Sequence, residues 1–230
     1  GFEGALEEGL EYKITELKQQ KMKFPAKSDY FDSMIKTLEA AVILAERYSK
    51  LAWQKYEQED DPVRKEELHL IAKTCHKVPR QGAVNLYEAL QSYILLWQVI
   101  NLEQLPNPYA FSVGNLDRIM QPYYKRNKIS KKLALQLIRH FLVFFEVGDR
   151  DWAISQNIMV GGSDVEGNDL SSDMTYIILE AYHQSNRPQP NLSVKMHAHT
   201  PFKFYQAISK FMFNFGHSSP SFLNDVAVFS

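Results

Sequence analysis

Two histidines separated by a single residue, His197 and His199, are the side chains whose type and spacing point most directly to chemistry. At the end of a strand, this spacing can place both imidazoles on one side, where they could bind a metal ion such as zinc. No carboxylate or cysteine lies close by in the sequence to complete a set of ligands. We therefore favour the alternative, in which both histidines belong to a turn and form hydrogen bonds with the backbone.

A cluster of acidic and amide side chains precedes these histidines: Asp164, Glu166, Asn168, Asp169 and Asp173. Such a cluster is typical of a calcium loop, but that loop requires glycine at its sixth position and glutamate at its twelfth. Counted from Asp164, Gly167 is fourth and Thr175 is twelfth. The pattern therefore favours a solvent-exposed turn and a helix N-cap over a metal site.

Two further features indicate ordinary structure. Gly161-Gly162 lacks both the Lys-Ser or Lys-Thr of a phosphate loop and the third glycine of a dinucleotide-binding fingerprint. Cys75, the one cysteine of the chain, occupies an apolar position in a predicted helix, which favours a buried thiol without a catalytic role. A single cysteine excludes an internal disulfide, and we expect the protein to work in a reducing cytoplasm.

Composition narrows the class of protein. With 230 residues and 45% hydrophobic content, the chain can bury a sizeable core. Lys and Arg number 26 against 27 Asp and Glu, so charge predicts no nucleic-acid partner and no anionic membrane surface. No apolar run reaches the roughly 18 residues that would predict a membrane span.

Apolar residues recur at helical spacing over the first two-thirds of the chain, which predicts a mainly helical structure there. One long helix is predicted around residues 31–52, with Ser28 or Asp29 as its N-cap. Asp61 as N-cap and Pro62 as first helical residue predict a second helix, which ends at about Lys77. A third segment, residues 84–102, is apolar on most of its circumference, which predicts a helix buried on nearly all sides.

The character of the chain changes after residue 147. Ser130 is predicted to cap a helix through residue 145, and a loop-rich region with several glycines follows. Within that region we expect a helix over residues 169–182, a strand over 192–196, a helix from Thr200-Pro201 to about residue 215, and a strand over 222–229. A helix between two apolar strands predicts a crossover unit and a parallel sheet. The fold class is therefore α/β, with a mainly helical portion over residues 1–147 and a loop-rich α/β portion over 148–230.

Several sequence blocks, in order, resemble the glycyl radical enzyme superfamily, which includes pyruvate formate-lyase, glycerol and diol dehydratases, choline trimethylamine-lyase and arylacetate decarboxylases. The most informative is the Pro-Gln-Pro turn and strand of residues 188–197. The others include residues 39–48, 71–79, 111–117, 156–162, 166–169 and 222–225. Two positions depart from the family pattern, since Asn115 and Lys195 stand where the family usually has arginine.

The resemblance implies a ten-stranded α/β barrel, to which this chain would contribute helices and the first strands. It also implies a protein-based glycyl radical, installed by an S-adenosylmethionine-dependent iron-sulfur activase, a catalytic cysteine and possible homodimers. The catalytic cysteine and radical glycine of the family lie after the block that ends at Asp225, so none is expected in this chain. Since the chain starts without methionine and ends in an apolar segment, we expect an internal piece of a longer enzyme.

The resemblance also suggests residues for a substrate pocket: Ala110, Ser112, Trp152 and Gln156. Ala110 stands where dehydratases and arylacetate decarboxylases tend to have a serine that binds substrate oxygen. In this position the chain resembles pyruvate formate-lyase, which has alanine there. Trp152 resembles a tryptophan near the active site of pyruvate formate-lyase, although an ordinary core aromatic is an equal alternative. Gln156 and the strand of residues 192–196 look more like the dehydratase and lyase branch.

We therefore expect a segment of an enzyme that cleaves a carbon–carbon or carbon–heteroatom bond of a small molecule, with a dehydratase or lyase favoured. One alternative is acyl transfer of the formate acetyltransferase type. The other is a catalytically inert helical scaffold, or a truncated paralogue. The buried helix predicted over residues 84–102 counts against an independent scaffold, because loss of the remaining barrel would expose its apolar surface.

Overall fold

The computed structural model of the chain describes residues 2–103, 112–146, 156–187, 189–213 and 220–225. The chain forms two compact units, Gly1–Glu103 and Gln104–Ser230. None of the helices in the described residues is long and apolar enough to cross a membrane. Helices α6 and α7 precede residue 147 and belong to the second of these units. The two portions inferred from composition, residues 1–147 and 148–230, remain a prediction.

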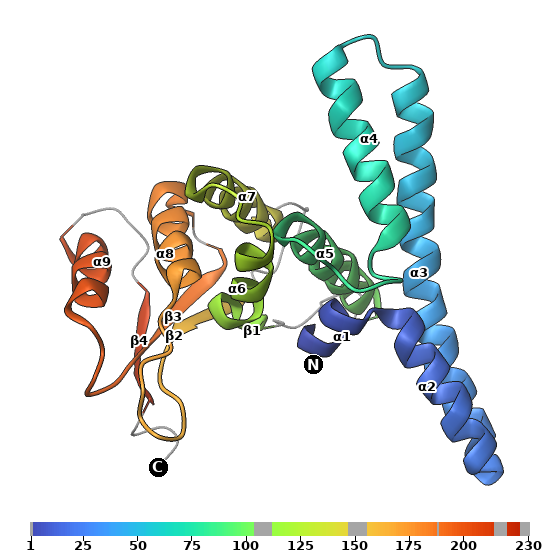
Figure 1. Ribbon diagram of the computed structural model, residues 1–230, viewed down its shortest axis with the longest axis horizontal. Helices are drawn as coiled ribbons and strands as arrows, with labels where there is room; N and C mark the ends of the chain where they lie inside the picture. Colours follow the sequence, from blue (N-terminus) through green and yellow to red (C-terminus); the bar gives the residue numbers. More distant parts are fainter. Residues whose placement is uncertain (1, 104–111, 147–155, 188, 214–219, 226–230) are drawn as a thin grey trace. The chain divides into compact units, whose positions relative to one another are not determined.

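The first unit is helical (Figure 1). Its elements are α1 (Phe2–Glu8), α2 (Leu10–Lys23), a 3-10 turn (Pro25–Lys27), α3 (Ser28–Glu57), α4 (Pro62–Lys77) and α5 (Leu86–Glu103). Helix α3 packs against both α2 and α4. Helix α4 confirms its prediction at both ends, because Asp61 accepts a hydrogen bond from the Val63 backbone N–H, Pro62 is the first helical residue and Lys77 is the last.

The predicted cap of the long helix is wrong. Helix α3 begins at Ser28 itself, so its capping position is Lys27, which makes no side-chain capping bond. The physical reason is Pro25, which starts a 3-10 turn that runs directly into α3. Ser28 and Asp29 are therefore already helical when they could have capped.

Helix α5 confirms the prediction of burial on nearly all sides. Leu86, Ala89 and Tyr93 have no exposed surface, and Leu95 is 2% exposed. Cys75 is also buried, in a cluster with Ala45 and Leu95. Burial raises the pKa of the Cys75 thiol to about 11, so this sulfur stays protonated and unreactive at neutral pH, as a structural residue should.

The second unit contains a parallel sheet. Its elements are β1 (Gly114–Asn115), α6 (Leu116–Arg126), α7 (Lys131–Val143), a 3-10 turn (Phe144–Glu146), β2 (Asn157–Gly161), α8 (Asp173–Ser185), β3 (Asn191–Met196), α9 (Phe202–Met212) and β4 (Ser221–Asn224). In the described residues the strands lie in the order β1-β2-β3-β4, and every neighbouring pair is parallel. The predicted parallel sheet and crossover are confirmed, whereas β1 and β2 lie in segments that the sequence did not mark as strands.

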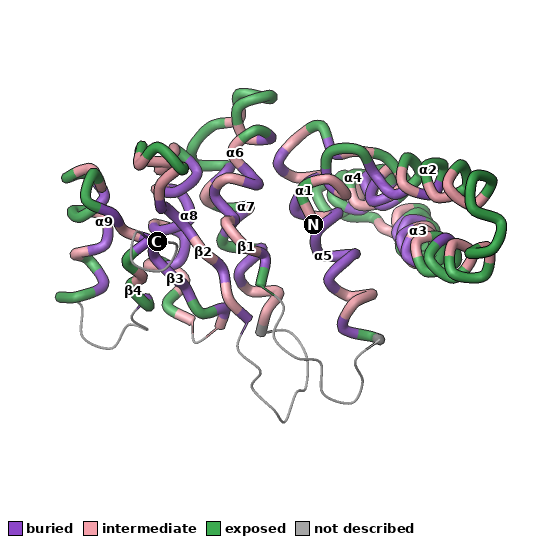
Figure 2. The backbone as a smooth tube through the Cα atoms, turned by 90° about the horizontal axis from the view of Figure 1, so that it is seen from below, coloured by how far each residue is buried: buried purple, intermediate pink, exposed green. Residues whose placement is uncertain are grey.

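The helices of this unit form one layer. Helix α8 contacts α6, α7 and α9, and both α6 and α8 contact β2 (Figure 2). One face of the sheet carries apolar side chains that are 0–1% exposed, Ile158, Val160, Leu192 and Val194. Because successive side chains alternate between faces, the other face carries Asn157, Met159, Ser193 and Lys195.

Helix boundaries in the second unit were predicted with mixed success. Ser130 caps α7 as expected, since its hydroxyl accepts a hydrogen bond from the Leu133 backbone N–H. The predicted start at Asp169 is wrong, because α8 begins four residues later at Asp173. Helix α9 begins at Phe202 rather than at Pro201, because Thr200 uses its hydroxyl to accept from the His197 N–H. Strand β4 ends at Asn224, and residues 226–230 of the predicted strand lie outside the described residues.

Candidate functional site

The carboxyl edge of the sheet is where α/β proteins usually place their ligands. Here that edge carries a network of buried charges. At its centre Asp117, which has no exposed surface, accepts hydrogen bonds from the Gly161 N–H at 2.8 Å, the Thr175 hydroxyl at 2.6 Å and the Arg118 N–H at 2.8 Å. Burial raises the pKa of Asp117, although these hydrogen bonds and the charge of Arg118 act in the opposite direction. The carboxylate therefore joins α6, β2 and α8.

The turn that follows β2 leaves room only for glycine. Arg118 donates a hydrogen bond from Nη2 to the Gly161 carbonyl oxygen at 3.0 Å. A Cβ on the next residue, Gly162, would lie 2.6 Å from Oδ2 of Asp225 and 2.9 Å from Nη2 of Arg118, and its φ is +95°. Gly162 is thus required by the close approach of two charged side chains, whereas a Cβ at Gly161 would lie 2.7 Å from the Lys195 carbonyl oxygen.

A second buried pair joins β3 to the end of β4. Nζ of Lys195 lies 2.7 Å from Oδ1 of Asp225, and the two side chains are 8% and 4% exposed. Oδ2 of Asp225 accepts a hydrogen bond from the Ser163 N–H at 2.7 Å. Burial by itself would raise the pKa of Asp225, but the hydrogen bonds from Lys195 and Ser163 and the charge of Lys195 outweigh it and hold the pKa below its usual value.

His197 has a carboxylate partner that its sequence neighbourhood did not reveal. Its Nε2 lies 3.1 Å from Oδ1 of Asp169, 28 residues earlier in the chain. Its Nδ1 accepts a hydrogen bond from the His199 backbone N–H at 3.3 Å, so Nε2 carries the proton and donates to Asp169. Asp169 is close to His197 in space although it is distant in the sequence, and the backbone hydrogen bond expected of a turn is confirmed. Across the described ranges, no group of three potential ligands gathers as a metal site would require.

The acidic cluster forms the expected solvent-exposed turn. The carboxylate of Asp164 accepts hydrogen bonds from the Glu166 N–H at 3.0 Å, the Asn168 N–H at 2.8 Å and the Asn168 side-chain amide at 2.9 Å. The side-chain hydrogen bond from Asn168 is the main reason that the pKa of Asp164 is lowered. This carboxylate organises its own loop.

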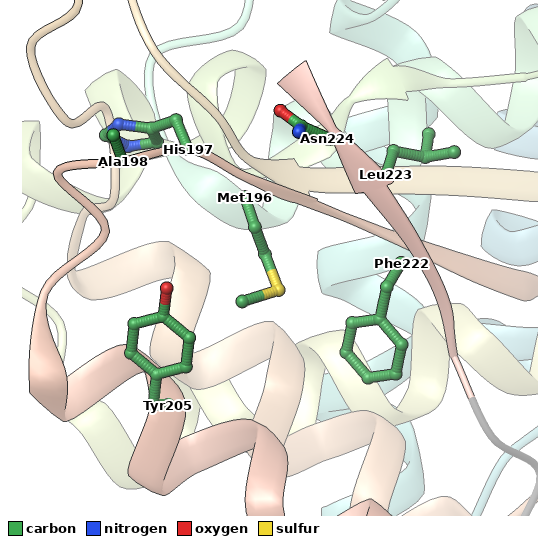
Figure 3. A pocket seen from close by; sticks show the side chains of 7 residues that line it. All are labelled: Met196, His197, Ala198, Tyr205, Phe222, Leu223 and Asn224. Atoms are coloured by element: carbon green, nitrogen blue, oxygen red, sulfur yellow. The ribbon is translucent and has the colours of Figure 1, made fainter. Parts of the chain in front are cut away.

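A pocket of about 580 Å³ lies beside the outer strand β4. It is lined by Met196, His197, Ala198, Tyr205, Phe222, Leu223 and Asn224. Figure 3 shows the side chains of Met196, Tyr205 and Phe222 pointing toward one another at its centre. The centre is thus apolar, and neither Ser112 nor Gln156, the two proposed pocket residues that the structure describes, is among its lining residues.

The amino edge of the same sheet has a different chemistry, built from hydroxyl and amide groups. Oε1 of Gln189 accepts a hydrogen bond from the Gln156 backbone N–H at 3.1 Å, and the Gln156 carbonyl accepts from the Asn191 N–H at 2.7 Å. The Asn157 carbonyl accepts from the Val113 N–H at 3.3 Å. These bonds hold together the three segments that lead into β1, β2 and β3.

Two of the four residues suggested for a pocket are found at this amino edge. Gln156 is 2% exposed and directly precedes β2. Ser112 is exposed and precedes β1, and its Oγ accepts a hydrogen bond from the Gly114 N–H at 3.1 Å. Ala110 and Trp152 lie outside the described residues.

Sequence reasoning missed two polar side chains that the structure brings together here. Ser193 is 7% exposed, and its Oγ donates a hydrogen bond to Oδ1 of Asn157 at 3.1 Å. A sequence signal for them exists: each is a polar residue within an apolar strand, at a position where the alternation of side chains places it on the face opposite to the apolar residues. The chain's one cysteine, Cys75, belongs to the first unit, so the strands of this edge carry hydroxyl and amide groups but no thiol of their own.

The whole chain, residues 1–230, matches a family model described as pyruvate formate lyase-like. Two similar proteins are a (2S)-3-sulfopropanediol dehydratase of Klebsiella oxytoca and an isethionate sulfite-lyase of Desulfovibrio desulfuricans. The first is 28% identical, with 98% of this chain matched to 29% of that protein. The second is also 28% identical, with 86% of this chain matched to 26% of that protein.

Solved structures show the same likeness. The glycerol-bound form of the B12-independent glycerol dehydratase of Clostridium butyricum superposes with a TM-score of 0.85 and 32% identity. The superposition covers 91% of this chain and 29% of the dehydratase. The chain thus spans less than a third of the length of these relatives.

Proposed function

The chain belongs to the pyruvate formate lyase-like family, and on that premise we propose that it is a segment of a glycyl radical enzyme of the dehydratase or lyase type. The observation that carries the proposal is the match of the entire chain to that family together with the nature of its relatives. A sulfopropanediol dehydratase, a sulfite-lyase and a glycerol dehydratase each take their name from the removal of a group from a small molecule.

In this proposal the radical chemistry is supplied by the remainder of the protein. A glycyl radical, installed by an S-adenosylmethionine-dependent activase, and a cysteine thiol would serve to remove a hydrogen atom from substrate carbon. This chain's part is to bind the substrate, to hold one hydrogen close to sulfur and to exclude water and competing hydrogen donors. A rigid framework suits that part, because a small displacement of the substrate lowers the rate steeply.

We assign the substrate contacts of this chain to the amino edge of the sheet. Ser112 and Gln156 supply a hydroxyl and an amide, which can hydrogen-bond a polar substrate without adding charge. Ala110 and Trp152 belong to the same proposal through the family resemblance. The charged groups of the carboxyl edge suit a structural role better, since each of the buried carboxylates described above already has its partners.

We also propose that the four strands begin a ten-stranded barrel. The outer strand β4 pairs only with β3 within the described residues. Beside it Phe222 and Tyr205 are 41% and 42% exposed, and they face each other across the pocket of Figure 3. A further strand and its covering helix would bury this apolar surface, which single domains rarely leave exposed. The possible homodimer and the cytoplasmic location predicted from the sequence remain predictions.

A second candidate is acyl transfer of the formate acetyltransferase type. Two sequence features favour it: Ala110 offers no hydroxyl where dehydratases have a serine, and Trp152 resembles a tryptophan of pyruvate formate-lyase. A site that uses a hydroxyl to bind its substrate discriminates strongly through it. The relatives reported above are dehydratases and a lyase, so elimination remains the first proposal.

The test is anaerobic activation of the full-length protein with its activase and S-adenosylmethionine. We expect an electron paramagnetic resonance signal of a glycyl radical, followed by elimination products from a panel of diols and hydroxysulfonates. Formation of acetyl-coenzyme A from pyruvate would instead select the second candidate. Absence of a radical under conditions that activate the glycerol dehydratase would overturn both, and would leave the scaffold interpretation.

A further inference from the structure

We propose that Asn157 and Ser193 form a site that recognises a hydroxyl group of the substrate. This inference rests on the proposed function, because it assumes that the protein binds a small-molecule substrate. Neither residue belongs to the set suggested by the sequence. Together they occupy neighbouring strands, β2 and β3, on the face of the sheet opposite to the buried residues Ile158 and Val194.

The backbone fixes the relative position of the two side chains. Strands β2 and β3 pair in register, with Asn157 opposite Asn191 and Met159 opposite Ser193. Asn157 and Ser193 are therefore diagonal neighbours on one face, a separation that side chains can bridge. They do so directly, because Oγ of Ser193 donates to Oδ1 of Asn157 at 3.1 Å. Since both residues lie within paired strands rather than in loops, the geometry is held rigidly.

The pair offers one donor and one acceptor to a ligand. In the observed orientation the Asn157 amide uses its oxygen for Ser193, which leaves its N–H groups to donate and the Ser193 oxygen to accept. The reversed amide would offer an oxygen to accept and the Ser193 hydroxyl to donate. A hydroxyl group is both donor and acceptor, so either arrangement matches it, whereas a carboxylate or sulfonate can only accept.

Charge does not disturb this recognition. The nearest cation along β3, Lys195, is held by Asp225 at 2.7 Å, so it is already neutralised. Gln156, which precedes Asn157, and Gln189, which accepts a hydrogen bond from the Gln156 N–H, are both uncharged. Burial sharpens the effect, because Ser193 is only 7% exposed and hydrogen bonds exchanged in a poorly hydrated place discriminate strongly between ligands. The site therefore selects the hydroxylated end of a small molecule.

The experiment measures binding to the full-length protein before activation, so that it does not depend on the radical. Isothermal titration with glycerol, 1,2-propanediol and isethionate compares wild type with Ser193→Ala and Asn157→Asp. Glycerol and 1,2-propanediol form a matched probe pair, because they differ by one hydroxyl. Ser209→Ala is the control, since the Ser209 hydroxyl donates to the carbonyl of Gln206 at 2.9 Å within α9.

We expect each site variant to weaken binding of at least one probe about tenfold, the usual consequence of one lost hydrogen bond. We also expect Ser193→Ala to reduce the ratio of affinities for glycerol and 1,2-propanediol, which a general loss of structure would leave unchanged. The control should bind as wild type does. The inference is overturned if no probe binds wild type or if the site variants bind the probes as wild type does. It is also overturned if Ser193→Ala lowers the affinities for the two diols by the same factor.

The outcome separates this inference from the proposed function. If binding changes as expected but activation yields no radical, then the function proposal fails and hydroxyl recognition stands. If the radical forms and products appear while the site variants keep the wild-type preference among the probes, then the function stands and this inference fails.

Discussion

The two edges of one four-stranded sheet differ in chemistry. At the carboxyl edge, Asp117, Lys195 and Asp225 are charged and at most 7% exposed, and each is bound by neighbouring groups. At the amino edge, Ser112 and Gln156 are neutral: the Ser112 hydroxyl accepts from the Gly114 N–H, and the Gln156 N–H donates to Oε1 of Gln189. The edge where α/β proteins usually bind ligands is here the one whose charges are already satisfied.

The comparison suggests that the two edges of one parallel sheet have different roles, one in stability and the other in binding. Buried charges that are paired or hydrogen-bonded hold distant segments in one geometry, because removing one partner leaves an uncompensated charge. Neutral amides and hydroxyls can exchange partners at lower cost, so they suit contacts that must form and break in each catalytic cycle. Four substitutions test this division.

The largest effect is expected from Lys195→Met. It leaves Asp225 buried without its partner at 2.7 Å and should destabilise the protein by about 3–5 kcal/mol. Lys210→Met is the matched control, because Lys210 and Glu180 are 50% and 30% exposed and a surface pair contributes about 1 kcal/mol or less. Urea unfolding measures both. Equal shifts in the two midpoints would show that the carboxyl edge does not depend on its buried charges.

The second largest loss of stability is expected from Gly162→Ala. Gly162 and Gly167 both have positive φ, +95° and +83°, but a Cβ at Gly162 meets Asp225 and Arg118 whereas Gly167 has nothing within 4 Å. Gly167→Ala therefore reports backbone strain alone, and the extra loss in Gly162→Ala reports the close contact. We expect that difference to be about 1–3 kcal/mol in unfolding free energy. No difference between the variants would mean that the turn can move away from the charged side chains.

The pH dependence of Asp225→Asn should reveal the ion pair. The pKa of Asp225 is lowered from its ordinary 3.8, so its ionised form stabilises the folded state above that pH, and this contribution is lost as pH falls through the lowered value. The stability difference between wild type and Asp225→Asn should thus shrink in acid. Asp117→Asn is the comparison of opposite sign, because burial raises the pKa of Asp117 and any contribution from it is lost as pH rises. A constant difference for Asp225→Asn between neutral and acid conditions contradicts the assignment.

The smallest change in stability is expected at the amino edge. Ser112 is exposed, and Ser112→Ala should alter the unfolding free energy by no more than about 0.5 kcal/mol. In the activated full-length enzyme the same change should lower kcat/KM about tenfold if the hydroxyl contacts substrate. A variant with unchanged stability and unchanged kcat/KM would remove Ser112 from the proposed site.

Local signals in the sequence predicted much of the fold. Asp61 with Pro62 and Ser130 mark helix starts because a cap acts within four residues. The predicted starts of α3 and α8 are wrong because of neighbouring structure. A preceding 3-10 turn makes Ser28 already helical, and a distant residue binds the carboxylate of Asp169. Asp169 accepts from Ser171 and pairs with His197, so it is not available to start α8.

The site was less accessible to sequence reasoning. Ser112 and Gln156 were suggested by family resemblance, and the structure places both at the amino edge. The partners of Asp117, however, lie 44 and 58 residues away at Gly161 and Thr175. No periodicity in one sequence encodes such pairings, because they arise only when strands and helices have packed. The same applies to the contact between Asn157 and Ser193.

The position of Asp225 near the end of the described chain has a consequence for biosynthesis. The ion pair between Lys195 and Asp225 forms only when Asp225 has emerged from the ribosome, 30 residues later in translation. Until then β3 lacks its outer neighbour β4, which leaves an unpaired strand edge of the kind that favours association with other chains. The first unit, Gly1–Glu103, is synthesised earlier and contains none of these strands. Chaperone demand during synthesis should therefore be concentrated on the second unit.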